Sequence, residues 1–95
     1  YILCCKTFSV AELLKPLLVK GQYSKDLDDV KETGIYDVMT GCTNYPAEVS
    51  TLNASTIIVL NHDSVNIKQL FLGRDNQLFY RTRKTNGWAS WSKVL

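Results

Sequence analysis

The sequence predicts an α+β domain, in which a small antiparallel β-sheet of four to five strands carries one or two short helices. A capping box followed by a leucine stripe near the N-terminus is typical of a short helix. After residue 55, runs of β-branched and aromatic residues alternate with short turns, and short turns favour antiparallel neighbours. A length of 95 residues leaves room for one small domain.

Residues 1–24 are expected to form a helical lead. Ser9–Glu12 is a capping box, and leucines 13, 14, 17 and 18 would line one face of the helix that it starts. Pro16 predicts a break or kink, and Gly21 predicts the end of the segment. The chain begins with Tyr1 rather than Met, so we read it as a fragment or processed product of a longer protein.

The next segment predicts one helical turn and a first strand. Asp26 is a good N-cap, and Leu27 and Val30 are spaced as in a single turn. Residues 35–39 are expected to form a strand with Tyr36 and Val38 on one face. Residues 40–53 are rich in Gly, Asn, Pro and Ser/Thr and predict a long surface loop.

The remaining strands are expected at 56–60, 67–72, 77–83 and 88–95. The run at 56–60 is continuously apolar and β-branched, which predicts a central strand covered on both faces. Residues 61–64 and 73–76 are expected turns, and Asn86–Gly87 is the strongest hairpin signal in the chain.

Charge and composition exclude several classes of function. The net charge of +2 gives no electrostatic case for nucleic acid, and the apolar runs are too short for a membrane helix. Cys4, Cys5 and Cys42 match no zinc pattern or closed disulfide framework, and nothing local ties His62 to a cysteine as a catalytic base. The three cysteines are expected to be buried or free thiols in a chain that folds under reducing conditions. No cofactor is expected.

No metal site is expected either. Asp26, Asp28 and Asp29 form the densest acidic cluster, and their spacing suits the start of a helical turn better than a set of metal ligands. The turns that hold His62–Asp63 and Asp75–Asn76 lack the spacing of a calcium-binding loop.

The order of short motifs from residue 25 to residue 95 resembles the knob module of phage and pyocin tail fibres. The motifs are DLDDV, TGIYDV, NYP, IIVL, KQLFLG, LFYRTR and, at the end, GWASWSKVL. The resemblance implies a domain of a bacteriophage tail fibre or receptor-binding protein, in the virion and assembled in the host cytoplasm. It implies a homotrimer that contacts other tail or baseplate proteins and a bacterial surface carbohydrate, without membrane insertion. Residues 1–24 would then link the 25–95 domain to an upstream fibre or baseplate region.

Aromatic and basic residues near the C-terminus are the candidate glycan-binding residues. Trp88 offers a platform for a sugar ring, while Arg81 and Arg83, on the face opposite Tyr80, would hold a carboxylate or phosphate. Each also has a purely structural interpretation, as a strand-packing aromatic or as a solvated sheet face. Trp88 and Trp91 lie three residues apart, which predicts opposite faces unless a bulge intervenes. The full set of receptor-binding candidates is Trp88, Tyr80, Arg81, Arg83, Asn86 and Tyr45, and Trp91 and Tyr36 are expected to be structural aromatics.

The favoured function is therefore attachment of a virion to a bacterial surface glycan or cell-wall polymer, with avidity supplied by the trimer. Sugar contacts are expected in the loop 40–53, the turns 61–64 and 73–76, and the residues 80–91. The alternative is a joint or spacer in a fibre or baseplate, without receptor contact, in which the leucine stripe packs against sister chains. A depolymerase fragment is a third hypothesis, but no facing pair of carboxylates can be placed, so no enzymatic activity is expected.

Overall fold

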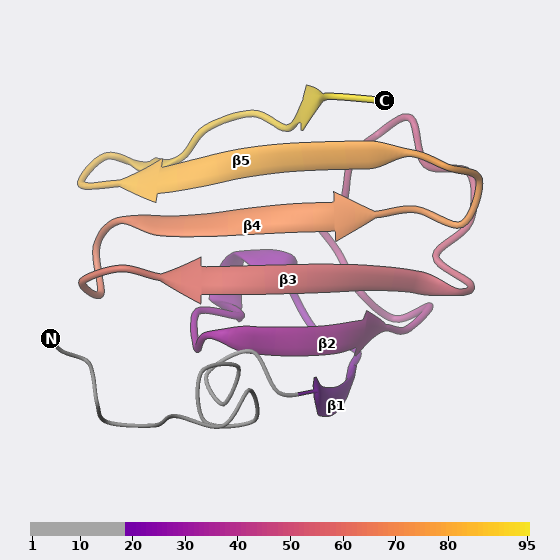
Figure 1. Cartoon of the computed structure of the whole chain (residues 1–95), viewed down its shortest axis with the longest axis horizontal. Coiled ribbons are helices and arrows are strands. Elements are labelled where there is room, and N and C mark those ends of the chain that lie inside the picture. The colour runs from indigo at the N-terminus through magenta and orange to yellow at the C-terminus, as the bar shows by residue number, and fades with distance from the viewer. Residues whose placement is uncertain (1–18) are drawn as a thin grey trace, which may run out of the picture.

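The structure is a computed structural model that describes residues 19–95, and these residues form a seven-stranded sheet with β1–β6 in chain order (Figure 1). The prediction of an α+β fold with four to five strands is wrong. The one helical element among residues 19–95 is a single 3₁₀ turn, and this part of the chain contains no helix long and apolar enough to span a membrane. The helix expected at 9–18 lies outside the described residues. The strands are β1 (Val19–Tyr23), β2 (Gly34–Val38), β3 (Ser55–Asn61), β4 (Ile67–Leu72), β5 (Leu78–Lys84), β6 (Gly87–Trp88) and β7 (Ser92–Lys93), and the 3₁₀ turn is η2 (Leu27–Asp29).

The first strand, β1, occupies part of the expected helical lead. It pairs with β2 in parallel, whereas every other strand pair is antiparallel. Gly21, which we expected to end a helix, lies inside β1 with a φ of 108°, where the register between the two strands shifts. Only glycine adopts this conformation readily, so the residue makes an irregularity in a strand rather than a helix terminus.

The bounds of the central strands agree with the ranges predicted from the sequence. β4 has the predicted bounds, and β2, β3 and β5 match their predicted ranges to within one residue at each end. Tyr36 and Val38 lie together on the buried face of β2, as predicted. The expected helical turn also forms, as η2, and Asp26 is its N-cap: a carboxylate oxygen of Asp26 accepts a hydrogen bond from the backbone N–H of Asp28 at 2.8 Å.

Two short strands share the free edge of β5. β6 pairs with its end at Arg83 and Lys84, and β7 pairs with its beginning at Phe79 and Tyr80. The predicted hairpin forms, with Thr85 and Asn86 as its turn and Gly87 in the left-handed region at a φ of 107°. The segment 89–91 leaves the sheet between β6 and β7, so the expected single strand over 88–95 is interrupted.

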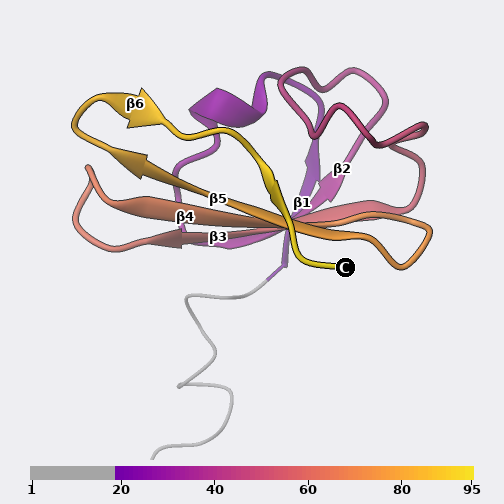
Figure 2. The same ribbon diagram turned by 90° about the horizontal axis from the view of Figure 1, so that it is seen from above.

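Among the elements formed by residues 19–95, one face of the sheet is covered and the other is open. Viewed along its edge, the sheet has η2, the loop between β2 and β3, and β6 with the segment that follows it on a single side (Figure 2). The loop was expected at the surface, yet it contributes four buried residues to this covered face. They are Cys42, Pro46, Val49 and Leu52, which pack over sheet residues such as Ile57, Val59, Phe71 and Phe79.

The opposite face, which we call the open face, is half-exposed. On β3, Ile57 and Val59 are fully buried, but Ile58 is half-buried and Leu60 is exposed. The expectation that this strand is covered on both faces is therefore wrong for the described residues. Ladder partners place an apolar row across four strands of the open face, formed by Ile35, Ile58, Leu70 and Tyr80.

Candidate functional site

Arg81 is the centre of a buried cluster on the covered face. Its side chain is 5% exposed, and its guanidinium carbon lies 4.2 Å from the ring centroid of Trp88 and 4.4 Å from that of Trp91. Nη1 forms an ion pair with Oδ1 of Asp28 at 2.9 Å, and Nε donates to Oε1 of Gln69 at 2.8 Å. Two indoles, a carboxylate and an amide thus surround a residue that the sequence offered as an exposed anion receptor.

Gln69 connects this cluster to the 3₁₀ turn. It is completely buried, and its Nε2 donates to the backbone carbonyls of Leu27 at 2.7 Å and Val30 at 3.0 Å. A buried amide is stable only when its polar atoms have partners, and here both ends of the amide are used. Sequence reasoning did not select Gln69. Its one sequence signal is a polar residue at a core-facing position between Ile67 and Phe71.

The two indole N–H groups connect this cluster to η2 and to the loop between β2 and β3. Nε1 of Trp88 donates to the carbonyl of Asp28 at 3.1 Å, and Nε1 of Trp91 donates to the carbonyl of Asn44 at 2.9 Å. Both rings therefore lie on the covered side, against the opposite-face expectation. The alternation that predicts opposite faces holds only within a continuous strand, and the strand stops at Trp88.

The charges around Arg81 partly balance one another. Burial lowers the pKa of Arg81, and the neighbouring carboxylate of Asp28 opposes that shift.

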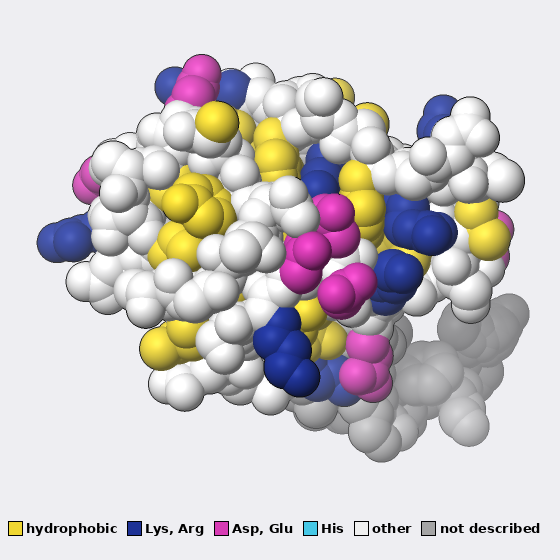
Figure 3. Space-filling view, turned by 180° about the vertical axis from the view of Figure 1, so that it is seen from behind, with side chains coloured by type: hydrophobic (Ala, Val, Ile, Leu, Met, Phe, Trp, Pro, Cys, Tyr) yellow, Lys and Arg dark blue, Asp and Glu magenta, His cyan; other side chains and the backbone are white. Residues whose placement is uncertain are grey.

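Asp26, the N-cap of η2, also has a shifted pKa. The hydrogen bond from Nδ2 of Asn44 to Oδ1 of Asp26, at 2.7 Å, is the main cause that lowers the pKa of Asp26. Figure 3 shows the covered face, where acidic side chains gather near the middle with basic side chains beside them.

Four of the six receptor-binding candidates line one hollow at the edge of β5. Tyr80, Arg81, Asn86 and Trp88 border a cavity of about 470 Å³, which we call the edge hollow. It lies where the chain leaves the sheet between β6 and β7. Its other lining residues are Thr82, Lys84, Gly87, Ala89, Ser90 and Ser92.

The other predicted residues lie elsewhere. Tyr45 is 38% exposed in the loop between β2 and β3, and Arg83 is half-buried opposite Trp88 in the β5–β6 pair. Tyr36 belongs to the core, and Trp91 packs edge-on against Phe71 with ring centroids 5.9 Å apart. The structure thus brings four candidates to one hollow. Tyr45 lies away from it, and Arg83, although it is the ladder partner of Trp88, does not line it.

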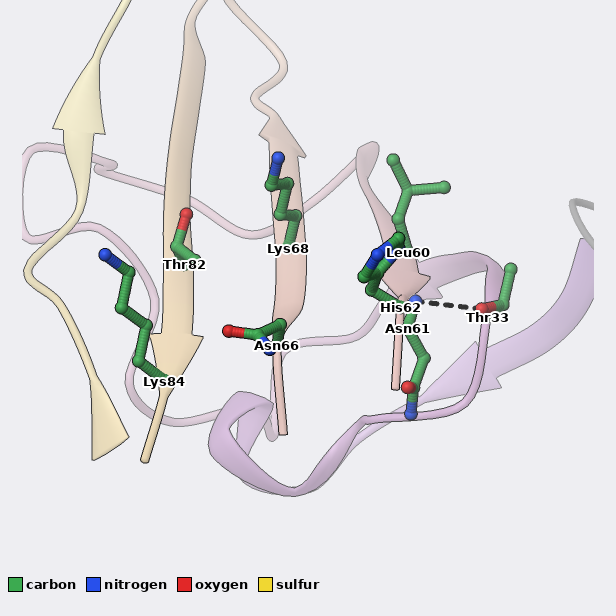
Figure 4. Close-up of a pocket in the computed structure, with 8 residues that line it drawn as sticks. All are labelled: Thr33, Leu60, Asn61, His62, Asn66, Lys68, Thr82 and Lys84. Atoms are coloured by element: carbon green, nitrogen blue, oxygen red, sulfur yellow. Dashed lines mark hydrogen bonds between the residues drawn. The ribbon is translucent and has the colours of Figure 1, made fainter. Parts of the chain in front are cut away.

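A second hollow lies at one end of the open face (Figure 4). Its volume is about 620 Å³, and we call it the open-face hollow. Thr82 and Lys84 line both hollows, so the two are adjacent across β5. The other lining residues are Thr33, Leu60, Asn61, His62, Asn66 and Lys68.

Neither a metal site nor a reactive cysteine is found in residues 19–95. No three His, Cys, Asp or Glu side chains in this part of the chain meet as ligands of one ion. Cys42 is a buried free thiol, as predicted, and lies 3.0 Å from the carbonyl of Tyr23. Burial raises the pKa of Cys42, which keeps it in the poorly nucleophilic thiol form. Cys4 and Cys5 lie outside the described residues.

Comparison with solved structures supports the resemblance read from the sequence. An N-truncated R2-type pyocin tail fibre matches 80% of this chain with a TM-score of 0.66 and 23% identity. An R1 pyocin fibre of P. aeruginosa matches the same share with a TM-score of 0.66 and 17% identity. The chain has the fold of a pyocin tail-fibre domain. It spans 32% of the first fibre chain and 21% of the second. No protein-family model and no curated protein matches the chain by sequence.

Proposed function

We propose that the chain is a domain of a phage or pyocin tail fibre that attaches the particle to a glycan or cell-wall polymer on a bacterial surface. The observation that carries this proposal is the edge hollow, where Tyr80, Asn86 and Trp88 come together on a tail-fibre fold. The chain would act in the virion or pyocin particle after assembly in the host cytoplasm. Its role is binding, without catalysis.

The residues of the edge hollow suit a sugar. The side chain of Tyr80 is 47% exposed, and an aromatic ring offers an apolar face to the C–H groups of a pyranose. Asn86 and two serines supply amide and hydroxyl groups that can donate to and accept from sugar hydroxyls. A shallow site of this kind binds weakly, so we propose that a homotrimer supplies avidity.

Cell-wall binding by paired variants tests this function. Tyr80→Ala/Asn86→Ala removes an aromatic ring and an amide from the edge hollow, while Tyr45→Ala/Asn53→Ala removes the same two groups from the loop on the covered side. The labelled 95-residue chain is added to purified cell walls from a panel of bacteria. We expect the edge variant to lose about tenfold or more in affinity for any wall that the wild type binds, and the loop variant to lose less than about twofold.

Two results would contradict the proposal. In one, the wild-type chain binds no wall in the panel and no sugar on a glycan array. In the other, the two double variants lose the same amount of binding.

The apolar row of the open face favours a second function, that of a joint or spacer in a fibre or baseplate. Ile35, Ile58 and Leu70 are half-buried and Tyr80 is exposed, and a contiguous apolar strip across four strands is typical of a surface that packs against another polypeptide. Ile58→Lys would then shift the chain to a smaller species in light scattering. An unchanged mass would count against this second function.

A further inference from the structure

We propose that the open-face hollow binds the acidic group of an anionic polysaccharide, a carboxylate or a phosphate carried on a sugar chain. This inference rests on the proposed attachment function and names the chemical class of its ligand. It also moves the anion site from Arg81 and Arg83, where the sequence placed it, to Lys68 and Lys84 on the other face of the sheet.

The charge of the lining residues supports an anionic ligand. Lys68 and Lys84 are exposed and carry ammonium groups, and within residues 19–95 no acidic residue lines the hollow. Asp63 belongs to the adjacent turn, but its carboxylate accepts hydrogen bonds from the backbone N–H groups of Val65 and Asn66. Neither lysine is in an ion pair among the described residues, so both ammonium groups are available to a ligand.

The strand register fixes the positions of these groups. Leu60, Lys68 and Thr82 are direct ladder partners on β3, β4 and β5, so an apolar side chain, an ammonium group and a hydroxyl form one row. Lys84 follows Thr82 by two residues and therefore lies on the same face. Figure 4 shows Lys68, Thr82 and Lys84 rising from the neighbouring strands β4 and β5.

The wall of the hollow beside Asn61 is also fixed. The backbone N–H of Asn61 donates to Oγ1 of Thr33 at 2.9 Å, and its side-chain amide donates to the carbonyl of Lys31 at 2.7 Å. These bonds hold the end of β3 against the segment before β2. On this side the hollow is thus bordered by anchored backbone, and its volume of about 620 Å³ is in the range of ligand pockets.

Continuity with the edge hollow indicates a polymer. Thr82 and Lys84 border both hollows, so a chain of sugars lying across β5 would touch both. The edge hollow offers an aromatic ring and neutral polar groups, and the open-face hollow offers two cations. A polysaccharide that alternates neutral sugars with a uronate or a phosphodiester carries matching groups along its length.

Isothermal titration of the 95-residue chain tests the inference. The ligands are an oligogalacturonate, a poly(glycerol phosphate) and a neutral dextran oligosaccharide, so the arms separate carboxylate from phosphate and both from uncharged sugar. Lys68→Gln/Lys84→Gln removes two cations from the hollow. Lys25→Gln/Arg74→Gln removes two exposed cations elsewhere and is the matched control for net charge. Thermal melts confirm that both variants fold.

We expect at least one anionic polymer to bind, with a loss of about tenfold or more in Lys68→Gln/Lys84→Gln and of less than about twofold in the control. Equal losses in both variants would show diffuse electrostatics and overturn the inference, as would binding of neutral dextran alone or of none of the three ligands. The failures of the two proposals are distinguishable. Wall binding that Tyr80→Ala/Asn86→Ala abolishes but Lys68→Gln/Lys84→Gln leaves intact would overturn this inference and support the proposed function.

Discussion

The two faces of the sheet use cationic residues in different ways. On the covered face, the guanidinium of Arg81 is enclosed by two indoles, a carboxylate and a buried amide. On the open face, Lys68 and Lys84 extend from the same two strands, β4 and β5, into an exposed hollow. Neighbouring residues of one strand thus alternate between holding the domain together and facing solvent. The role of a basic residue on a strand therefore depends on whether other segments cover the sheet face from which it projects.

The largest expected effect comes from Gln69→Leu. Leucine fills a similar volume but leaves Nε of Arg81 and the carbonyls of Leu27 and Val30 without their partner. Buried polar groups without partners cost about 1–3 kcal/mol each, so we expect a loss of about 4 kcal/mol in the free energy of unfolding. Urea denaturation measures it. Lys68→Leu, one residue earlier and on the open face, should change stability by less than about 0.5 kcal/mol. Similar losses in both variants would refute the contrast between the faces.

Arg81→Met is expected to have the next largest effect. It removes the ion pair with Asp28 and the contacts with both indoles, and leaves Oε1 of Gln69 without its donor. We expect a loss of about 2–3 kcal/mol, because Asp28 is partly exposed and water can solvate it once it is unpaired. Lys84→Met on the same strand is the control. Both tryptophans of the chain contact Arg81, so their fluorescence emission should shift only in Arg81→Met.

Smaller effects are expected from Trp88→Phe and Trp91→Phe. Each keeps an aromatic ring near Arg81 but loses one indole hydrogen bond, to Asp28 or to Asn44. We expect about 1–2 kcal/mol for each, measured by chemical denaturation. Because the two indoles share Arg81, the double variant should lose a different amount from the sum of the single losses. Strict additivity would mean that the three side chains do not act as one cluster.

The smallest expected effect is the loss of folding stability at acidic pH. Asn44 and the backbone N–H of Asp28 hold the pKa of Asp26 below its ordinary value of 3.8. A carboxylate with a lowered pKa stabilises the fold above its unfolded pKa, and that stability is lost as the pH falls through the folded pKa. We therefore expect unfolding to become easier below about pH 3.8, by less than about 1 kcal/mol from this group. Asp26→Asn does not titrate, so its stability should fall less steeply with acid than that of the wild type. Parallel acid profiles would exclude a role for Asp26.

The local parts of this structure were predictable from sequence, and the long-range parts were not. The cap at Asp26, the buried pair Tyr36 and Val38, and the Asn86–Gly87 hairpin depend on residues close together in the chain. β1 was missed because a parallel pair joins distant segments and because Gly21 also fits a helix end. The burial of the loop after β2 was not predicted, because its buried residues do not follow the spacing of a strand.

The candidate site shows the same limit. Alternation along β5 correctly separated Tyr80 from Arg81 and Arg83, but it did not show which face is covered. That depends on η2 and the C-terminal segment, which reach Arg81 through Asp28 and Trp91. Lys68 was not selected because a single exposed lysine on a strand is ordinary. It becomes a candidate only when the register places it beside Thr82.

The most direct test of the contrast between the faces is a nuclear magnetic resonance titration of the isotope-labelled chain with the anionic oligosaccharide that binds. We predict that the side-chain signals of Lys68 and Lys84 and the nearby backbone amides shift with ligand. The Nε–H of Arg81 and the indole N–H of Trp91, which are held inside the covered cluster, should stay in place. Large shifts at Arg81 and Trp91 with none at Lys68 and Lys84 would contradict the account, because the cluster on the covered face would then be the binding site.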